Sequence, residues 1–62
     1  MIYTEEEMRI FELYPDKTKE ELIPILEDSI EAAKAQGDLY VPEVCGTTLR
    51  KIRQELAEQV QN

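Results

Sequence analysis

The sequence contains no histidine and no tryptophan, one cysteine, two glycines and no long apolar run. Without histidine it lacks the commonest general base and metal ligand at neutral pH, and its two glycines are not spaced as in a phosphate-binding loop. The single cysteine excludes an internal disulfide, and with it a small secreted domain stabilised by disulfides. The apolar runs are far shorter than the ~20 residues of a membrane span. We therefore expect a cytoplasmic protein with no membrane segment and no cofactor.

The 62 residues suffice for one small domain, and they carry a net charge of −7. A domain of this size buries only about 60% of the surface that its unfolded chain exposes. The charge is uneven, because residues 1–38 hold eleven acidic and four basic side chains, whereas residues 39–62 hold three of each. This balance argues against direct binding to nucleic acid, which favours basic domains. It suits either general solubility or a basic protein partner.

The first helix is predicted from Glu5 to about Tyr14. Thr4 and Glu7 have the spacing of a capping box, and Pro15 ends the helix because proline disfavours the helical conformation in the residue before it. The apolar side chains cover more than half of the helix circumference. They are Met8, Ile10, Phe11, Leu13 and Tyr14. Either this helix is wedged between two others, or Ile10 or Leu13 belongs to a partner-binding surface.

The second helix is the longest amphipathic segment and is predicted from Lys19 to about Gln36. Thr18 and Glu21 form a second capping box, and Gly37 supplies the closing residue. Both other helices are expected to pack against its apolar stripe, which consists of Leu22, Ile25, Leu26, Ile30 and Ala33. The opposite face is a candidate acidic partner surface that consists of Glu27, Asp28 and Glu31.

Pro24 lies past the first turn of this second helix, where it removes a backbone hydrogen bond. We expect either one kinked helix or two separate pieces, and we favour the kinked helix.

The third helix is predicted from about Pro42 to Val60, with fraying after Val60. The preceding segment, residues 38–43, has a second interpretation, in which Asp38 caps a helix that begins at Leu39. Tyr40 is a large ring in either case, so it lies over the core or belongs to a surface patch.

A narrow apolar stripe marks the third helix and consists of Cys45, Leu49, Ile52, Leu56 and Val60. We expect Cys45 to be a buried structural thiol, since no histidine is present to activate it as a nucleophile. Gly46 falls inside the helix, where it costs about 1 kcal/mol relative to alanine. Close approach of a neighbouring helix would explain this glycine.

Arg50, Lys51 and Arg53 form the only basic cluster of the sequence. At helical spacing they point in three directions, which favours a solvated face over a nucleic-acid-binding edge. The start of the helix, residues 42–48, has no basic residue, although a DNA-recognition helix would need one there. The many carboxylates lie at helix starts and on solvated faces and do not form a pair in a cleft. We therefore expect no enzymatic activity.

Three segments resemble the transposon-transfer assisting protein family, small proteins encoded in conjugative transposons. Residues 3–14, YTEEEMRIFELY, resemble its opening; residues 18–23, TKEELI, resemble its second-helix start; residues 47–52, TTLRKI, resemble its closing signature. The chain departs from the family at Arg9, where asparagine is usual, at residues 31–33, where relatives break the helix, and in lacking an acidic-aromatic ending. The resemblance implies an accessory role in transfer of a mobile element and carries over no catalytic or binding residue.

Together these observations predict a compact all-α three-helix bundle with short connections. The expected function is that of a non-enzymatic accessory protein of a conjugative transposon, acting through contacts with an unidentified protein. A basic partner would suit the acidic first two helices. The candidate partner surface comprises Ile10, Leu13, Tyr40, Glu27, Asp28 and Glu31. The alternative is a small DNA-associated regulator or excision factor that uses Arg50, Lys51 and Arg53. The chain is expected to be a monomer or a weak homodimer that buries Ile10, Leu13 or Tyr40.

Overall fold

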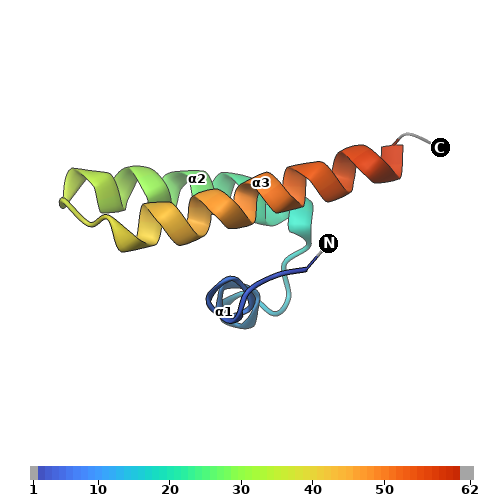
Figure 1. Cartoon of the computed structure of the whole chain (residues 1–62), viewed down its shortest axis with the longest axis horizontal. Coiled ribbons are helices and arrows are strands. Elements are labelled where there is room, and N and C mark those ends of the chain that lie inside the picture. Colours follow the sequence, from blue (N-terminus) through green and yellow to red (C-terminus); the bar gives the residue numbers. More distant parts are fainter. Residues whose placement is uncertain (1, 61–62) are drawn as a thin grey trace.

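The computed structural model of the protein describes residues 2–60, which form three α-helices and no strand within that range. The helices are α1 (Glu5–Leu13), α2 (Lys19–Ala35) and α3 (Tyr40–Val60). In Figure 1, α2 and α3 lie side by side as an antiparallel hairpin, and α1, seen nearly end-on, lies across it. The predicted all-α three-helix bundle with short connections is confirmed. None of the three helices combines the length and apolarity needed to cross a membrane. The fraying predicted after Val60 lies outside the residues that the structure describes.

Both predicted capping boxes are present. The Thr4 hydroxyl accepts from the Glu7 amide at 3.2 Å, and the Glu7 carboxylate accepts from the Thr4 amide at 2.8 Å. Thr18 and Glu21 repeat the arrangement with the same two distances. Each box satisfies amides that a helix start leaves without intrahelical partners, so the sequence locates both starts.

The second helix is continuous through Pro24 and does not split into two pieces. At its end, Gly37 adopts a positive φ of 78°, and the amides of Gly37 and Asp38 donate to the carbonyls of Lys34 and Ala33. This pair of bonds is the Schellman arrangement, for which a left-handed residue such as glycine is needed.

The third helix begins at Tyr40 and not near Pro42 as favoured from the sequence. Asp38 Oδ1 accepts from the amides of Tyr40 at 2.9 Å and Val41 at 3.3 Å, so this carboxylate caps the helix. Pro42 is accommodated in the first turn, where its missing amide would have no intrahelical partner. The capping role that the alternative interpretation gave to Asp38 is the one observed.

The core lies mainly between α2 and α3, and α1 packs against α3. Its buried apolar side chains are Ile10, Leu22, Leu26, Cys45, Leu49 and Ile52. The expectation that α2 receives both other helices is therefore wrong, since α3 is the helix that contacts α1 and α2. The idea that α1 is wedged between two helices is also wrong, because one side of it stays open to solvent, with Leu13 73% and Met8 52% exposed.

Gly46 has no neighbour within 4 Å of the position that a Cβ atom would occupy. The expected close approach of a neighbouring helix is therefore not the reason for this glycine. Nothing in the structure explains it.

Candidate interaction surface

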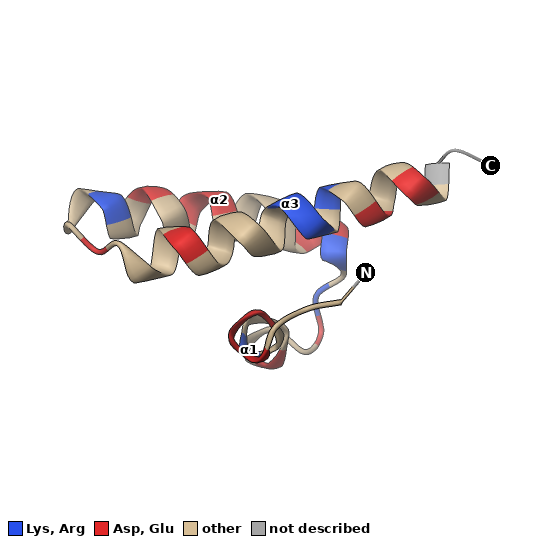
Figure 2. Ribbon diagram, in the orientation of Figure 1, with Lys and Arg blue, Asp and Glu red and all other residues tan. Residues whose placement is uncertain are grey.

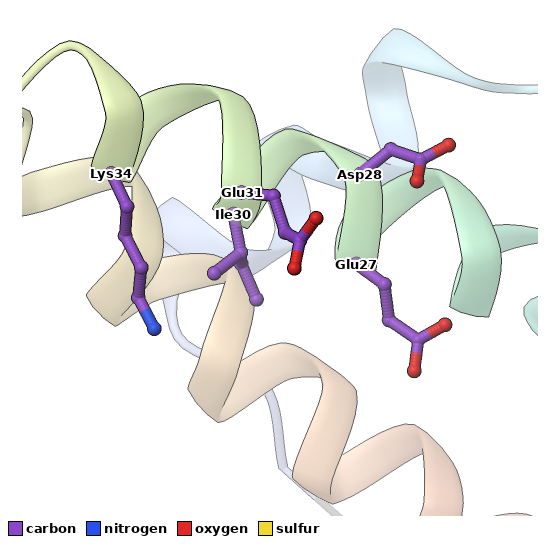
Figure 3. Close-up of a pocket in the computed structure, with 5 residues that line it drawn as sticks. All are labelled: Glu27, Asp28, Ile30, Glu31 and Lys34. Atoms are coloured by element: carbon purple, nitrogen blue, oxygen red, sulfur yellow. The ribbon is translucent and has the colours of Figure 1, made fainter.

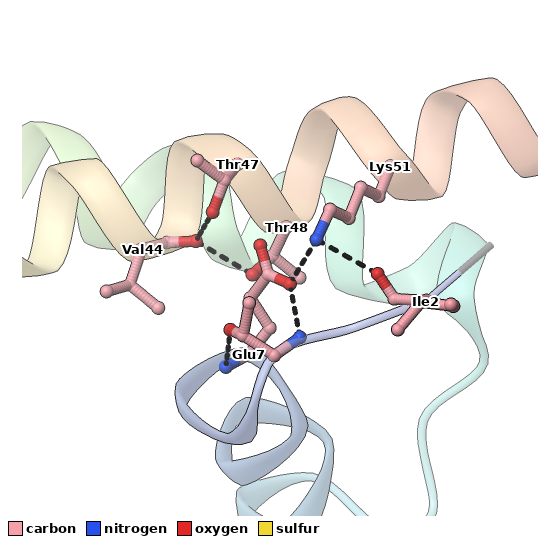
Figure 4. A network of polar contacts seen from close by, with 7 residues as sticks. Ile2, Glu7, Val44, Thr47, Thr48 and Lys51 are labelled. Atoms are coloured by element: carbon pink, nitrogen blue, oxygen red, sulfur yellow. Dashed lines mark hydrogen bonds and ion pairs between the residues drawn. The ribbon is translucent and has the colours of Figure 1, made fainter.

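An ion pair between the buried Glu7 and the partly exposed Lys51 joins α1 to α3 (Figure 4). Glu7 is only 2% exposed, and its Oε1 accepts from Lys51 Nζ at 2.6 Å as well as from the Thr4 amide. Lys51 Nζ also donates to the carbonyl of Ile2 at 3.0 Å. One carboxylate therefore caps α1 and, at the same time, holds the segment before α1 against the third helix.

The electrostatics of Glu7 agree with this geometry. Burial by itself would raise the pKa of this carboxyl, but the hydrogen bonds from Lys51 and the Thr4 amide, together with the nearby Thr47 hydroxyl, outweigh it and lower the pKa to about 2. Glu7 is therefore charged over the physiological range, and its Oε1 accepts two hydrogen bonds. Its surroundings suit a structural anchor and leave no free carboxylate for acid–base chemistry.

Tyr3 completes the attachment of the N-terminal segment. Its ring packs edge-on against Phe11, with centroids 4.9 Å apart and planes at 82°, and lies near the ammonium groups of Lys19 at 5.3 Å and Lys51 at 5.8 Å. Lys19 also pairs with Glu55 of α3. Burial and the nearby Glu55 carboxylate raise the pKa of the Tyr3 hydroxyl, which finds no hydrogen-bond partner of normal geometry among the described residues.

An apolar groove of about 340 Å³ opens between α1 and the start of α3, with Leu26 and Ser29 of α2 also in its lining, and we call it the α1–α3 groove. Its floor is formed by Ile10, Leu26 and Cys45, which are 8%, 1% and 6% exposed. Its edges carry two large apolar side chains that remain in solvent, Leu13 at 73% and Tyr40 at 61%. The rest of the lining is formed by Glu6, Arg9, Tyr14, Ser29, Val41 and Val44.

The structure brings together three of the residues predicted as a partner surface. Leu13 and Tyr40, which are 27 positions apart in the chain, face the same groove from opposite sides. Ile10 lies below them as part of the core, so it can shape the groove but offers little surface of its own.

The predicted acidic residues Glu27, Asp28 and Glu31 lie elsewhere, around an open hollow that shares no lining residue with the α1–α3 groove. Figure 3 shows that Asp28 points away from Glu27 and that Lys34 extends on the same side as Glu27 and Ile30. Glu27 is paired with Arg53 of α3. Because of Lys34 and Arg53, this face is less acidic than its three carboxylates by themselves suggest.

The three basic side chains of the predicted alternative nucleic-acid face make different contacts. Lys51 is committed to Glu7, and Arg53 NH2 donates to Glu27. Arg50 is exposed and borders a second hollow, beside the α1–α3 groove, that also contains Glu6 and Glu43. In the ribbon of Figure 2, the basic positions of α3 lie together in the middle of the helix, with acidic positions toward both of its ends.

Cys45 is buried at the floor of the groove, and burial raises the pKa of its thiol. The neutral thiol is therefore favoured over the reactive thiolate. Among residues 2–60, no group of three or more acidic or thiol side chains is arranged to hold a metal ion.

The sequence pattern did not reveal the residues that make polar contacts between the helices. Glu7 was predicted as a cap, and Lys51 as part of a solvated face or of the alternative nucleic-acid face, whereas the structure pairs them across 44 positions. A capping glutamate and a helical lysine are ordinary in sequence, so neither residue signals its partner. Only the docking of α1 on α3 brings them together.

Comparison with known proteins gives no relative, since no protein-family model, no curated protein and no solved structure matches this chain.

Proposed function

We propose that this chain is a non-enzymatic accessory protein of a conjugative transposon and acts through protein–protein contacts in transfer or its regulation. The observation that carries the proposal of protein contacts is the α1–α3 groove, where Leu13 and Tyr40 are left in solvent beside an apolar floor. Apolar side chains grouped around a hollow of this kind are typical of interaction sites, whereas isolated exposed ones are ordinary.

The assignment to a conjugative transposon rests on the resemblance of residues 3–14, 18–23 and 47–52 to the transposon-transfer assisting protein family. Those segments contain both capping boxes and the Glu7 and Lys51 anchors, so they bear mainly on how the chain folds. The place of this protein in the transfer process is therefore best tested in cells that carry the element.

The alternative, a DNA-associated regulator, would need its basic side chains free for phosphates. Lys51 and Arg53 are engaged with carboxylates, and the net charge of −7 opposes approach to a polyanion. We therefore retain protein contact as the proposed mode of action.

The test is an affinity capture with the tagged whole chain from cells that carry the complete element, combined with a mobility-shift assay on duplex DNA at low salt. We expect a protein encoded by the element to be captured, and we expect the purified chain to leave DNA unshifted. A DNA shift that is lost on Arg50→Ala substitution would favour the regulator instead. Failure to capture any protein of the element, without a DNA shift, would refute both functions.

A further inference from the structure

The described chain divides into an N-terminal arm, residues 2–14, and a hairpin, residues 18–60, which are joined by a hinge, residues 15–17. All three hinge residues are exposed. Within the described residues, the only backbone hydrogen bond across the hinge runs from the Lys17 amide to the Tyr14 carbonyl, at 3.2 Å. α1 and α2 each have their own capping box, so neither helix start depends on the hinge. The hinge can therefore change direction with little loss of structure on either side.

The contacts that attach the arm to the hairpin are ones that a second copy of the chain can supply unchanged. Lys51 makes both side-chain hydrogen bonds between arm and hairpin in the described residues, to Glu7 Oε1 at 2.6 Å and to the carbonyl of Ile2 at 3.0 Å (Figure 4). The ring of Tyr3 lies 5.8 Å from the same ammonium group, and Ile10 joins the core. α1 packs against α3 and not against α2, the helix that follows it in the chain. The docking face on α3 is therefore complementary, in charge and in apolar contact, to the arm of any copy.

Neither part of the chain is expected to stay folded by itself. α1 has nine residues, and isolated helices shorter than ~12 residues are marginal in water. The hairpin is close to the ~40 residues below which a domain rarely folds unaided, and without the arm it would expose the surface of α3 that α1 covers. A released arm therefore docks again, either on its own hairpin or on that of another copy.

We propose that two copies of this chain exchange their arms, so that the arm of each copy docks on α3 of the other. The exchanged dimer keeps the contacts of the monomer except those at the hinge, so the hinge decides between the two forms. A short tether holds the arm at its own hairpin at an effective concentration on the order of 1 mM, and this value falls toward zero when the tether cannot span the sites. The monomer therefore prevails in dilute solution, and the exchanged dimer prevails near ~1 mM or when the hinge is shortened.

The experiment mixes two full-length variants, Glu7→Lys and Lys51→Glu, by unfolding them together in urea and refolding them. In each variant by itself, positions 7 and 51 carry like charges, and their repulsion opposes docking of the arm in the monomer and in a dimer of that variant. In a mixed exchanged dimer, one docking face has the native pair and the other has the same pair reversed. Only exchange between the two variants brings opposite charges together at both faces.

We expect the mixture to sediment as a one-to-one dimer at ~10 µM, about a hundredfold below the concentration at which the wild type dimerises. Its urea midpoint should exceed that of either variant, whereas each variant alone should be monomeric or unfolded. The matched control mixes Glu27→Arg with Arg53→Glu. Glu27 and Arg53 pair across α2 and α3, inside the hairpin that is not exchanged, so this mixture should give no dimer and no gain of stability.

A second variant tests the hinge and leaves the docking face intact. Deleting Asp16 and Lys17 shortens the connection by up to ~7 Å, so that the arm no longer reaches its own docking face. We expect this chain to be a dimer at ~10 µM. Adding Leu13→Ser should not dissociate it, since Leu13 is 73% exposed and contributes little to docking of the arm. Inserting three glycines after Asp16 of the wild type keeps the arm within reach, and that chain should be a monomer at the same concentration.

The proposal would be overturned by absence of a dimer from the Glu7→Lys and Lys51→Glu mixture, by an equal gain in the control mixture, or by a shortened-hinge chain that is not a dimer. A shortened-hinge dimer that Leu13→Ser dissociates would also overturn it, because such a dimer would be held at the α1–α3 groove and not by exchanged arms. The inference concerns self-association only. Its failure therefore leaves the proposed role in transfer as it stands, and failed capture from cells leaves the exchange of arms as it stands.

Discussion

The Glu7–Lys51 pair gives the sharpest test of how α1 is held on α3. Replacing Lys51 by Met removes the ammonium group and leaves the 2%-exposed Glu7 carboxylate without its charged partner. Breaking one side of a buried ion pair typically costs about 3–5 kcal/mol, because the remaining charge stays desolvated. The capping bond from the Thr4 amide remains, so we expect a loss near the lower limit, about 3 kcal/mol. A domain of this length has a total stability of only about 3–9 kcal/mol, so this loss would remove about a third of it at the least and all of it at the most.

Glu7→Gln is expected to be milder, with a loss of about 1 kcal/mol. Glutamine can keep the capping bond to the Thr4 amide, and Lys51 can keep its bond to the Ile2 carbonyl and remains partly exposed to water. The double variant Glu7→Gln/Lys51→Met should therefore be more stable than Lys51→Met, because it no longer buries an unpaired charge.

Urea unfolding at pH 7, followed by circular dichroism, measures these differences as shifts of the midpoint. Arg53→Met is the matched control, since the pair of Arg53 with Glu27 is about half exposed on both sides and should contribute less than about 1 kcal/mol. If Lys51→Met cost no more than Arg53→Met, or if adding Glu7→Gln failed to restore stability, then the ion pair does not anchor α1.

Three further predictions follow from the described geometry. Because folding lowers the pKa of Glu7 from an ordinary 4.5 to about 2, the stabilising effect of its charge is present above pH 4.5 and is lost as the pH falls toward 2. Urea unfolding at a series of acidic pH values should therefore show a smaller loss of unfolding free energy for Glu7→Gln than for the wild type. Tyr3→Phe should leave the free energy of unfolding unchanged or raise it by up to about 1 kcal/mol, because the buried hydroxyl has no hydrogen-bond partner of normal geometry in the described residues. If urea unfolding instead showed a loss above about 1 kcal/mol, the hydroxyl would be hydrogen-bonded to Glu55. Gly37→Ala should lower the free energy of unfolding by about 1 kcal/mol, because alanine disfavours the φ of 78°. Gly46→Ala should raise the free energy of unfolding by about 1 kcal/mol, and with it the thermal midpoint, since a Cβ atom there meets nothing within 4 Å. Equal effects of the two substitutions would contradict the role of backbone conformation.

Hydrogen bonds between near neighbours in the chain explain why the starts of α1 and α2 were predicted correctly. Thr4 with Glu7, and Thr18 with Glu21, satisfy helix-start amides within four residues of chain, so the pattern carries the whole interaction. The start of α3 was placed too late because Pro42 and Asp38 offer competing signals. The carboxylate of Asp38 prevails, since it accepts from two amides and proline fits in the first turn.

The candidate surface was predicted in part. The apolar arc of α1 exceeds what a single neighbouring helix can cover, and this excess indicated an exposed residue at Ile10 or Leu13. Periodicity does not tell which edge of the arc meets α3. Packing buries Ile10 and leaves Leu13 in solvent opposite Tyr40.

The sequence by itself determined three helices, the caps at the starts of α1 and α2 and the apolar stripes of α2 and α3, because each of these depends on residues at most a few turns apart. The tertiary structure decided the rest. It made α3 the helix against which both others pack, paired the capping Glu7 with Lys51, and placed Leu13 and Tyr40 at the same groove. These outcomes depend on how α1 lies across the hairpin, and residues brought together from 27 or 44 positions apart leave no periodic trace in the sequence.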